Sequence, residues 1–469
     1  MSEELDKLTW EAMQKLAQEV GPVEGYNLTD LGNAERLVLR HKDKLRYCHP
    51  WRKWLVWNGS RWKVDATAEV WRYAVETIRY IYAEAGDIED TEKRRKVGNH
   101  AIRSESEAKI KALISLANCQ EGIPVLPDEL DKDPLLLNVS NGVVDLCTGK
   151  KLDHSKEKLI TKLAPVKFDT TATCPKWIDF LNKIMIENNA LIQYLQRVAG
   201  YCLTGKTGEH KLFLLYGSGA NGKSTFVKVL QTILGDYAVK VDSELLIAKP
   251  VGTHTTSVTD LKGARLAVAI EVQEGRRLAE AFVKELTGGD SITARRMRQD
   301  NMTFEPTHKI ILATNHKPVI HETTHALWRR IDLIPFSFVF EKDKQIKDYH
   351  DILLSEEKDG IFQWILEGCL EWQRQGLGEP PEVIEATREY RTDMDILGDF
   401  IADRCIIGPK NEVSNKELRE AYSDWCRQNG EKEISPKAFS TRLEEQGFVK
   451  LKNLGTRRER GWKGIVIKS

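Results

Sequence analysis

Residues 212–224 read LFLLYGSGANGKS, an apolar run that leads into the octapeptide GSGANGKS at Gly217–Ser224. The octapeptide matches the pattern G-x-x-x-x-G-K-[ST] without a mismatch, and TFVKVLQTIL follows it with the spacing of an amphipathic helix. Glycines between a strand and a helix let backbone N–H groups surround phosphate oxygens, and the helix start adds partial positive charge. A chance match in a glycine-rich turn is the alternative, but the strand and the helix on either side favour a phosphate-binding loop.

This loop predicts binding of ATP and Mg²⁺. We expect the Lys223 ammonium to reach the β- and γ-phosphates and the Ser224 hydroxyl to bind Mg²⁺. A loop of this kind does not by itself separate kinases, GTPases and motor ATPases. The predicted nucleotide-binding residues are contiguous: Gly217, Ser218, Gly219, Ala220, Asn221, Gly222, Lys223, Ser224 and Thr225.

Two further apolar runs, RLAVAIE at 265–271 and HKIILATN at 308–315, alternate with helical patterns. This alternation is typical of an α/β layer with a mainly parallel sheet. Glu271 ends the first run, where an acid would hold Mg²⁺ and polarise the attacking water, and Glu274 follows one short turn later. Either glutamate is a candidate base, and the alternative is that both are only the polar end of a buried strand. Asn315 ends the second run and is a candidate to orient the lytic water, although an Asn after a strand is commonly a turn former.

Arg329 and Arg330 stand just before another apolar run, DLIPF at 332–336. An arginine in this position is a candidate finger that reaches the γ-phosphate bound by a neighbouring subunit. Adjacent residues cannot both point into one site, so a surface salt bridge is the alternative role for one of the two.

The stretch GGDSITARRMRQDNMTFEP at 288–306 predicts a β-hairpin with arginines near its tip. Guanidinium groups on a hairpin can follow DNA phosphates irrespective of base sequence. A solvated arginine cluster is the alternative. The candidate DNA-binding residues here are Arg295, Arg296 and Arg298, with Lys284 as a further candidate on the same surface.

The C-terminal residues are basic although the whole chain is neutral, with 70 basic and 70 acidic side chains. From Pro436 onward, nine Lys and Arg residues stand against three Glu. Helical patterns open at Asn415 and Pro436, and two short strands flank the turn LGTRRERGWKG, which is the order of a winged helix. A winged helix can bind DNA or another protein. Its candidate DNA-binding residues are Lys437 and Arg442 on the second helix and Arg457, Arg458 and Arg460 on the wing.

In the N-terminal part, KWLVWNGSRWKV at 53–64 predicts a hairpin with a two-residue turn at Asn58-Gly59. Its tryptophans are expected to pack across the strands rather than stack on bases. LLLNVSNGVVDLCTGK at 135–150 predicts a second hairpin, and the stretches 1–45, 66–117 and 174–203 have helical patterns.

Length and composition limit the other classes. A chain of 469 residues corresponds to about three domains. Eight isolated cysteines without a CxxC pair disfavour a zinc ribbon, and no apolar run reaches about 18 residues. We therefore expect a soluble, intracellular protein without membrane contact. The expected division is a helical extension at 1–45, a mostly helical domain with β-hairpins at 46–190, an ATPase domain at 191–345, a helical connector at 346–395 and a basic winged-helix-like domain at 396–469.

Five segments stand in a fixed order within residues 217–336: GSGANGKS, AIEVQEGRRL, KELTGGDSITARR, LATNHKP and ALWRRIDLIPF. This series resembles superfamily 3 helicases, and specifically the phage/plasmid and poxvirus-type primase-helicase family. The segment at 135–150 is similar to part of that family's N-terminal helical domain. The resemblance covers residues 45–345 well and the C-terminal residues more loosely.

The resemblance implies a multidomain α/β protein with a central P-loop, AAA+-like ATPase. It implies that Lys223 and Ser224 bind the nucleotide and Mg²⁺, that Glu271 with Glu274 forms the Walker B acid pair, and that Asn315 is the sensor.

For the assembly, the resemblance implies a trans-acting finger at Arg330, with Arg329 the weaker candidate. It also implies a homo-hexameric ring with ATP between subunits, one DNA strand in the pore and 3′-to-5′ movement. Larger members carry a primase domain ahead of this region. Because residues 1–45 contain no carboxylate cluster for nucleotidyl transfer, we expect a separate primase.

We therefore predict an ATP-dependent DNA helicase of a phage or other mobile element, which acts on single-stranded and forked DNA during replication in the cytoplasm of a bacterial host. One alternative is an origin-binding initiator ATPase without processive unwinding, which sequence-preferring duplex binding by residues 396–469 would favour. A P-loop kinase of a small substrate is the other. Monomeric behaviour without DNA stimulation would favour it, but the sequence offers no obvious lid or acceptor pocket.

Overall fold

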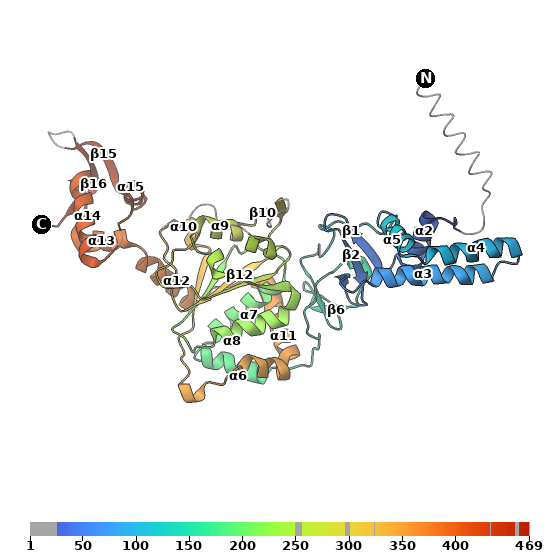
Figure 1. Cartoon of the computed structure of the whole chain (residues 1–469). Coiled ribbons are helices and arrows are strands. Elements are labelled where there is room, and N and C mark those ends of the chain that lie inside the picture. The colour runs from blue at the N-terminus through green and yellow to red at the C-terminus, as the bar shows by residue number, and fades with distance from the viewer. Residues whose placement is uncertain are drawn as a thin grey trace, which may run out of the picture. The chain divides into compact units, whose positions relative to one another are not determined.

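The computed structural model describes residues 26–248, 256–295, 301–322, 324–431, 433–454 and 459–468. The chain divides into two compact units, Met1–Asp145 with Lys150–Phe168, and Leu146–Gly149 with Asp169–Ser469 (Figure 1). The finer division into five parts stays a prediction. Among the described helices, none combines the length and the apolar character needed to cross a bilayer.

The first unit combines helices with two small antiparallel sheets. Three of its helices share one apolar core and α4 packs along α3; they are α2 (Asp30–His41), α3 (Glu69–Gly86), α4 (Thr91–Ser104) and α5 (Glu107–Ala117). The sheets are β1 (Leu45–Cys48), β2 (Lys53–Trp57) and β3 (Trp62–Val64), and β4 (Leu136–Val139), β5 (Gly142–Asp145) and β6 (Lys150–Leu152). Both predicted hairpins are confirmed, and β1 is an additional strand. Of the predicted helical extension at 1–45, residues 1–25 lie outside the described residues.

The turn of the β2–β3 hairpin differs from the prediction. Trp57 pairs with Trp62, so the four residues 58–61 connect the strands instead of two. Asn58 explains the longer turn, because its Oδ1 accepts hydrogen bonds from two backbone N–H groups of the turn at 3.0 and 2.9 Å. The Trp57 and Trp62 rings lie 5.7 Å apart and Trp62 is fully buried, which is the packing role expected for them.

Five parallel strands form the central sheet of the second unit (Figure 1). In hydrogen-bonding order they are β13 (Ile331–Pro335), β7 (Leu212–Tyr216), β12 (Lys309–Thr314), β9 (Leu266–Ile270) and β8 (Ala238–Val241). The predicted α/β layer is therefore confirmed, and its sheet is entirely parallel. The sequence did not predict β8, because this edge strand is short and only partly buried and lacks the continuous apolar run of the inner strands.

Four helices pack together beside this sheet: α6 (Pro175–Ile184), α7 (Asn189–Leu203), α8 (Lys223–Leu234) and α11 (Tyr349–Gln375). Glycines permit the close approach of α7 and α11. A Cβ at Gly200 would lie 2.0 Å from the Cys369 backbone nitrogen, and one at Gly368 would lie 2.1 Å from the Gln196 carbonyl oxygen. The helical run predicted from Pro175 is confirmed as two helices, α6 and α7.

A hairpin and two helices complete this part of the unit: α9 (Glu280–Gly288), β10 (Ile292–Arg295), β11 (Asn301–Phe304) and α10 (His325–Trp328). The antiparallel pairing of β10 with β11 confirms the predicted hairpin, and residues 296–300 at its tip lie outside the described residues. One apolar core joins Leu214 of the sheet to Val283 of α9, Phe304 of the hairpin and Trp328 of α10. The base of the hairpin is therefore anchored in the core of the sheet.

After α12 (Pro381–Asp393), the chain forms a C-terminal module. Its elements are α13 (Ile396–Arg404), β14 (Cys405–Ser414), α14 (Asn415–Asn429), α15 (Pro436–Glu445), β15 (Val449–Leu454) and β16 (Glu459–Ile467). Both predicted helix starts are confirmed, and Ser414 and Glu417 form a reciprocal capping box at α14. The sequence did not predict α13 or β14. In β14 the strand pattern is interrupted, because the strand contains Gly408-Pro409 and its register shifts before Glu412.

Candidate nucleotide-binding site

The predicted phosphate-binding loop connects β7 to α8, as the sequence indicated. Two of its glycines have left-handed backbone, with φ of 109° at Gly219 and 84° at Gly222. A Cβ at Gly222 would lie 2.6 Å from Ile184 Cγ2, and one at Gly217 would lie 2.4 Å from the Phe336 carbonyl oxygen. Both the backbone conformation and the lack of space therefore require glycine in this loop.

Lys223, the first residue of α8, is held by acceptors on three sides. Its Nζ donates to the Gly217 carbonyl at 2.7 Å and to Oδ1 of Asn221 and of Asn315 at 2.9 Å each. The residue is 5% exposed, and this burial lowers the pKa of its ammonium to about 8. Neutral oxygens satisfy the three N–H bonds here, and the more strongly accepting oxygens of a phosphate could replace them.

The strand order brings the other candidate residues to the same place. Because β12 lies between β7 and β9, its end at Asn315 stands between the loop and Glu271. A cavity of about 310 Å³ opens there. It is lined by Gly219, Ala220, Asn221, Gly222, Lys223, Ser224, Thr225, Ile270, Glu271, Ala313, Thr314 and Asn315. Of the nine loop residues predicted to bind nucleotide, Gly217 contributes only its carbonyl and Ser218 does not line the cavity.

The two candidate acids differ in position. Glu271 lines the cavity and has a left-handed backbone with φ of 61°, while its N–H donates to the Ala313 carbonyl at 2.8 Å. Such a conformation is uncommon for a residue with a side chain and is found preferentially at functional sites. Glu274 is exposed and does not line the cavity. The structure therefore brings only Glu271 to the loop, and its role as base stays a prediction.

The residues around the cavity fit a magnesium–nucleotide complex. The Ser224 hydroxyl and the Glu271 carboxylate both line it, and oxygen donors of this kind are what Mg²⁺ prefers. Asn221 was among the predicted loop residues, but the sequence pattern did not predict its contacts, since its position is unspecified in the motif. Its side chain is 2% exposed, accepts from Lys223 and donates through Nδ2 to the Phe336 carbonyl at 3.2 Å.

Arg329 and Arg330 lie at the opposite edge of the sheet from this cavity. Ile331 pairs with Leu212, the first residue of β7, and the Leu212 N–H donates to the Arg330 carbonyl at 2.6 Å. The loop follows the other end of β7, and a five-residue strand spans roughly 16 Å. Neither arginine is among the residues that line the cavity of its own chain.

The candidate DNA-binding residues of the hairpin region separate into three groups. Arg295 is exposed at the last position of β10, where it pairs with Asn301 across the strands. Arg296 and Arg298 lie outside the described residues. Lys284 lies on α9 instead of the hairpin, and its Nζ is 2.9 Å from both carboxylate oxygens of Glu322.

In the C-terminal module, the prediction for α15 requires a correction. Lys437 is exposed, whereas Arg442 is only 7% exposed and lines a cavity together with Asp395 and Asp399. Five residues separate the two, which places them about 140° apart around a helix. Arg460 is exposed on β16, and Arg457 and Arg458 lie outside the described residues.

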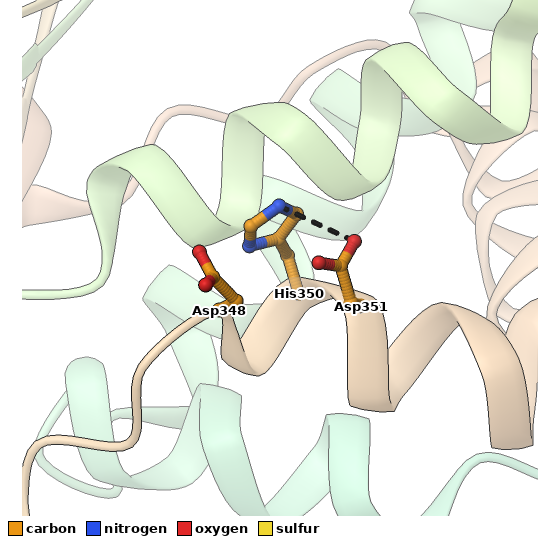
Figure 2. A group of neighbouring side chains, drawn as sticks. All are labelled: Asp348, His350 and Asp351. Carbon is orange, nitrogen blue, oxygen red and sulfur yellow. Dashed lines mark ion pairs between the residues drawn. The ribbon is translucent and has the colours of Figure 1, made fainter.

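A second group of possible metal ligands lies at the start of α11. Figure 2 shows Asp348, His350 and Asp351, whose ligand atoms lie within 4.8 Å of one another. The His350 Nε2 is 3.5 Å from Asp351 Oδ1, and both aspartates are exposed. Exposed acidic groups of this kind are common without a metal ion, and nothing else in the described residues points to one here.

Two family models match parts of the chain. Residues 34–186 match the family described as D5 N terminal like, and residues 215–330 match a family of unknown function (DUF5906). The first match covers much of the N-terminal unit, and the second contains the loop, β9, the hairpin and both arginines. These matches confirm the resemblance to the D5-like primase-helicase family.

Individual relatives are viral proteins. The chain is 30% identical over 324 residues to "Putative helicase L207/L206" of Acanthamoeba polyphaga mimivirus, which covers 64% of this chain and 34% of that protein. It is 26% identical over 327 residues to "Putative primase C962R" of African swine fever virus (strain Badajoz 1971 Vero-adapted), again covering 64% and 34%. The chain thus spans about a third of the length of these relatives. The apo structure of the NrS-1 C-terminal region is similar with a TM-score of 0.49 and 12% identity, covering 92% of this chain and 98% of that chain.

Proposed function

We propose that this chain is an ATP-dependent DNA helicase that acts in replication. The observation that carries the proposal is the cavity at the carboxyl edge of the sheet, where Lys223, Ser224, Glu271 and Asn315 meet beside a glycine-rich loop. The names of the viral relatives, which include helicases and primases, support a replication role.

The chemistry assigned to the cavity is phosphoryl transfer from ATP to water. Lys223 would exchange its neutral acceptors for the β- and γ-phosphates, and the Ser224 hydroxyl with the Glu271 carboxylate would hold Mg²⁺. Mg²⁺ supplies charge neutralisation on the phosphates. Glu271 would also take the proton of the attacking water, and the Asn315 amide would orient that water once Lys223 has turned to the phosphates.

The site proposed for the reaction is completed by a second subunit. Arg330, with Arg329 as the weaker candidate, lies at the far edge of its own sheet and would therefore serve a neighbour's γ-phosphate. Repeating this head-to-tail contact generates a closed ring. We propose a homo-hexamer of AAA+-like subunits that moves 3′-to-5′, in line with the family resemblance.

The proposed DNA contacts are the β10–β11 hairpin and the C-terminal module. Arg295, Arg296 and Arg298 would follow one strand through the ring, and the winged-helix-like module would touch forked DNA through Lys437 and Arg460. In this proposal a separate primase supplies primers, and the protein belongs to a phage or mobile element replicating in the cytoplasm of a bacterial host.

Unwinding of a forked duplex and ATP hydrolysis test the proposal together. Lys223→Ala should abolish both, and the exposed Lys228→Ala on the same helix is the matched control. When Arg330→Ala protein is mixed into wild-type protein at increasing ratio, the unwinding activity should fall more steeply than the fraction of wild-type subunits. ATPase activity that ignores DNA and tolerates the mixture would overturn the helicase proposal.

An origin-binding initiator without processive unwinding is the second candidate. Its support is the pair of exposed basic residues Lys437 and Arg460 on the C-terminal module. Binding of the full chain to one duplex sequence in preference to others, without unwinding of a fork, would favour it.

A further inference from the structure

Two carboxylates attach the helix before the DNA hairpin to the segment before the arginines. On α9, the Glu280 carboxylate accepts a hydrogen bond from the His321 backbone N–H at 2.8 Å. One turn later, the Lys284 ammonium lies 2.9 Å from both carboxylate oxygens of Glu322. The two side chains of this Lys284–Glu322 pair are 33% and 22% exposed, so water screens the pair only in part.

Glu322 continues this connection toward the arginines. Its carbonyl accepts a hydrogen bond from the Trp328 indole N–H at 2.8 Å, and Trp328 is the last residue of α10, directly before Arg329. Partial burial raises the pKa of the Glu322 carboxyl. Hydrogen bonds from Thr324 and Lys284, together with the positive charges of Lys284 and Arg330, outweigh this effect and lower the pKa. The carboxylate therefore stays ionised between the two basic groups.

At its other end, α9 connects to the DNA hairpin. The helix ends at Gly288, and β10 begins at Ile292. The His210 ring nitrogen Nδ1 lies 2.8 Å from the Thr287 carbonyl, which restrains the last turn of α9. Val283 of α9 and Ile292 of the hairpin belong to one apolar core, so α9 and the base of the hairpin would move as one body.

We propose that Lys284 and Glu322 are positioning residues that couple the DNA hairpin of a subunit to the arginines it offers to its neighbour. The inference rests on the proposed function. DNA bound to the hairpin would act on α9, the Lys284–Glu322 pair would carry that displacement to α10, and Arg330 would move relative to the neighbour's nucleotide. This assignment replaces the sequence-based expectation that Lys284 itself touches DNA.

Charge reversal separates the two roles of Lys284. Each single variant of the full chain, Lys284→Glu or Glu322→Lys, should lower the oligo(dT)-stimulated ATP turnover about tenfold. The double variant should recover most of the lost turnover, because residues in contact couple by about 0.5–3 kcal/mol. A direct DNA contact predicts a different result. Lys284→Glu and the double reversal would then lose oligo(dT) affinity alike, and that result would overturn the inference.

A complementation assay tests where the pair acts. Arg330→Ala retains its own loop, Lys223→Ala retains its arginines, and mixing them should restore ATPase activity at interfaces that combine the two. Glu322→Gln added to the Lys223→Ala subunit should lower this activity, while the same change in the Arg330→Ala subunit should not. A loss of equal size in both subunits would mean that Glu322 only supports folding, and would overturn the inference.

The control and the remaining outcomes keep the two proposals apart. The control is the ion pair between Arg276 and Glu244, whose charged atoms lie 2.8 Å apart and whose side chains are 37% and 36% exposed. No bond of the described residues connects this pair to α10. Its double reversal and both single reversals should leave the complementation unchanged. If Lys223→Ala and Arg330→Ala, without any further change, fail to restore activity when mixed, both the proposed shared site and this inference are wrong. If the mixture is active and Glu322→Gln changes its ATPase activity in neither subunit, only the inference about Glu322 is wrong.

Discussion

The two edges of the central sheet are built differently. At the carboxyl edge, the loop, Glu271 and Asn315 come from three adjacent strands of one chain and line a common cavity. At the amino edge, Arg329 is exposed and Arg330 is tied by its backbone carbonyl to the start of β7. One edge gathers the groups that we propose bind a nucleotide, and the other carries two arginines that do not line the cavity of their own chain.

The amino edge is nevertheless rigid just behind the arginines. Asp332 is buried in β13, where its carboxylate accepts hydrogen bonds from the Tyr194 hydroxyl and, at 2.6 Å, from the Lys211 ammonium. Lys211 also lies 2.5 Å from Glu379. Arg330 itself is partly buried, and its Nη1 donates to the Ala326 carbonyl at 2.6 Å. A contact with a phosphate of another subunit would therefore exchange this neutral acceptor for a more strongly accepting one.

The largest expected effect tests whether the amino edge acts on another subunit. Arg330→Ala should lower ATP turnover of the assembled protein about 10³-fold, the lower end of what arginine fingers contribute, while ATP binding stays within about twofold. Turnover under saturating ATP and binding of a fluorescent ATP analogue measure the two. Arg329→Ala is the matched control and should lower turnover less. Equal losses of binding and turnover would place the arginine in its own chain's site.

The next effect concerns the carboxyl edge. Glu271→Gln should retain ATP binding and lose hydrolysis by about 10²–10³-fold, because the amide cannot accept the proton of the attacking water. Single-turnover hydrolysis of radiolabelled ATP measures the loss. Glu274→Gln, which changes an exposed glutamate three residues away, should hydrolyse ATP at the wild-type rate. If Glu274→Gln lost hydrolysis and Glu271→Gln did not, Glu274 would have replaced Glu271 in the cavity when ATP binds.

Stability tests the rigid base of the amino edge. Asp332→Ala leaves the buried Tyr194 hydroxyl without its acceptor, while Lys211 keeps Glu379, and it should lower the free energy of unfolding by about 1–3 kcal/mol. Urea unfolding measures this difference. Glu341→Gln, in an exposed pair with Lys344 whose side chains are both 67% exposed, should change it by less than about 0.5 kcal/mol. A loss at Asp332 as small as that of the control would contradict a structural role for the buried pair.

The smallest effect is a pH dependence at the carboxyl edge. Burial lowers the pKa of Lys223 to about 8, and bound phosphates would raise it again. Below pH 8 the ammonium is already present, so ATP affinity should be nearly constant. Above pH 8 binding takes up a proton, and the Kd for ATP should rise by up to about tenfold per pH unit.

Titration of ATP binding between pH 7 and pH 9 checks this slope. Lys223→Arg is the control, since its guanidinium stays charged over the whole range and should give a flat profile. Equal slopes in the two proteins would assign the pH dependence to another group.

Local patterns predicted much of the site. The strands at 212–217, 265–271 and 308–315, the loop between strand and helix, the hairpin and the helix starts at Asn415 and Pro436 are all present. Each follows from short-range chemistry: apolar runs, glycines at a tight loop, or a capping serine before a helix. Of the missed elements, the strands β1, β8 and β14 lack a continuous apolar run, whereas α13 carries a capping residue, Asp395, that was not recognised.

Residues that depend on long-range packing were harder to predict. The pairing of Lys284 with Glu322 was not predicted, because the two residues lie 38 positions apart in the chain, and a DNA contact of Lys284 stays untested. Arg442 was expected on a DNA-contacting surface, but it is only 7% exposed and lines a cavity together with Asp395 and Asp399, which lie more than 40 positions before it. Spacing along the chain carries no information about such contacts.

The sequence by itself determined the glycine-rich loop between strand and helix, the α/β character of the second unit and the residue types at the strand ends, because backbone geometry and apolar periodicity act over a few neighbouring residues. Only the tertiary structure decided that Glu271 reaches the cavity while Glu274 does not, and that the arginines stand at the far edge from their own loop. The first fact follows from the backbone after β9, which is left-handed at Glu271, and the second from the parallel pairing of β13 with β7, which joins segments distant in sequence.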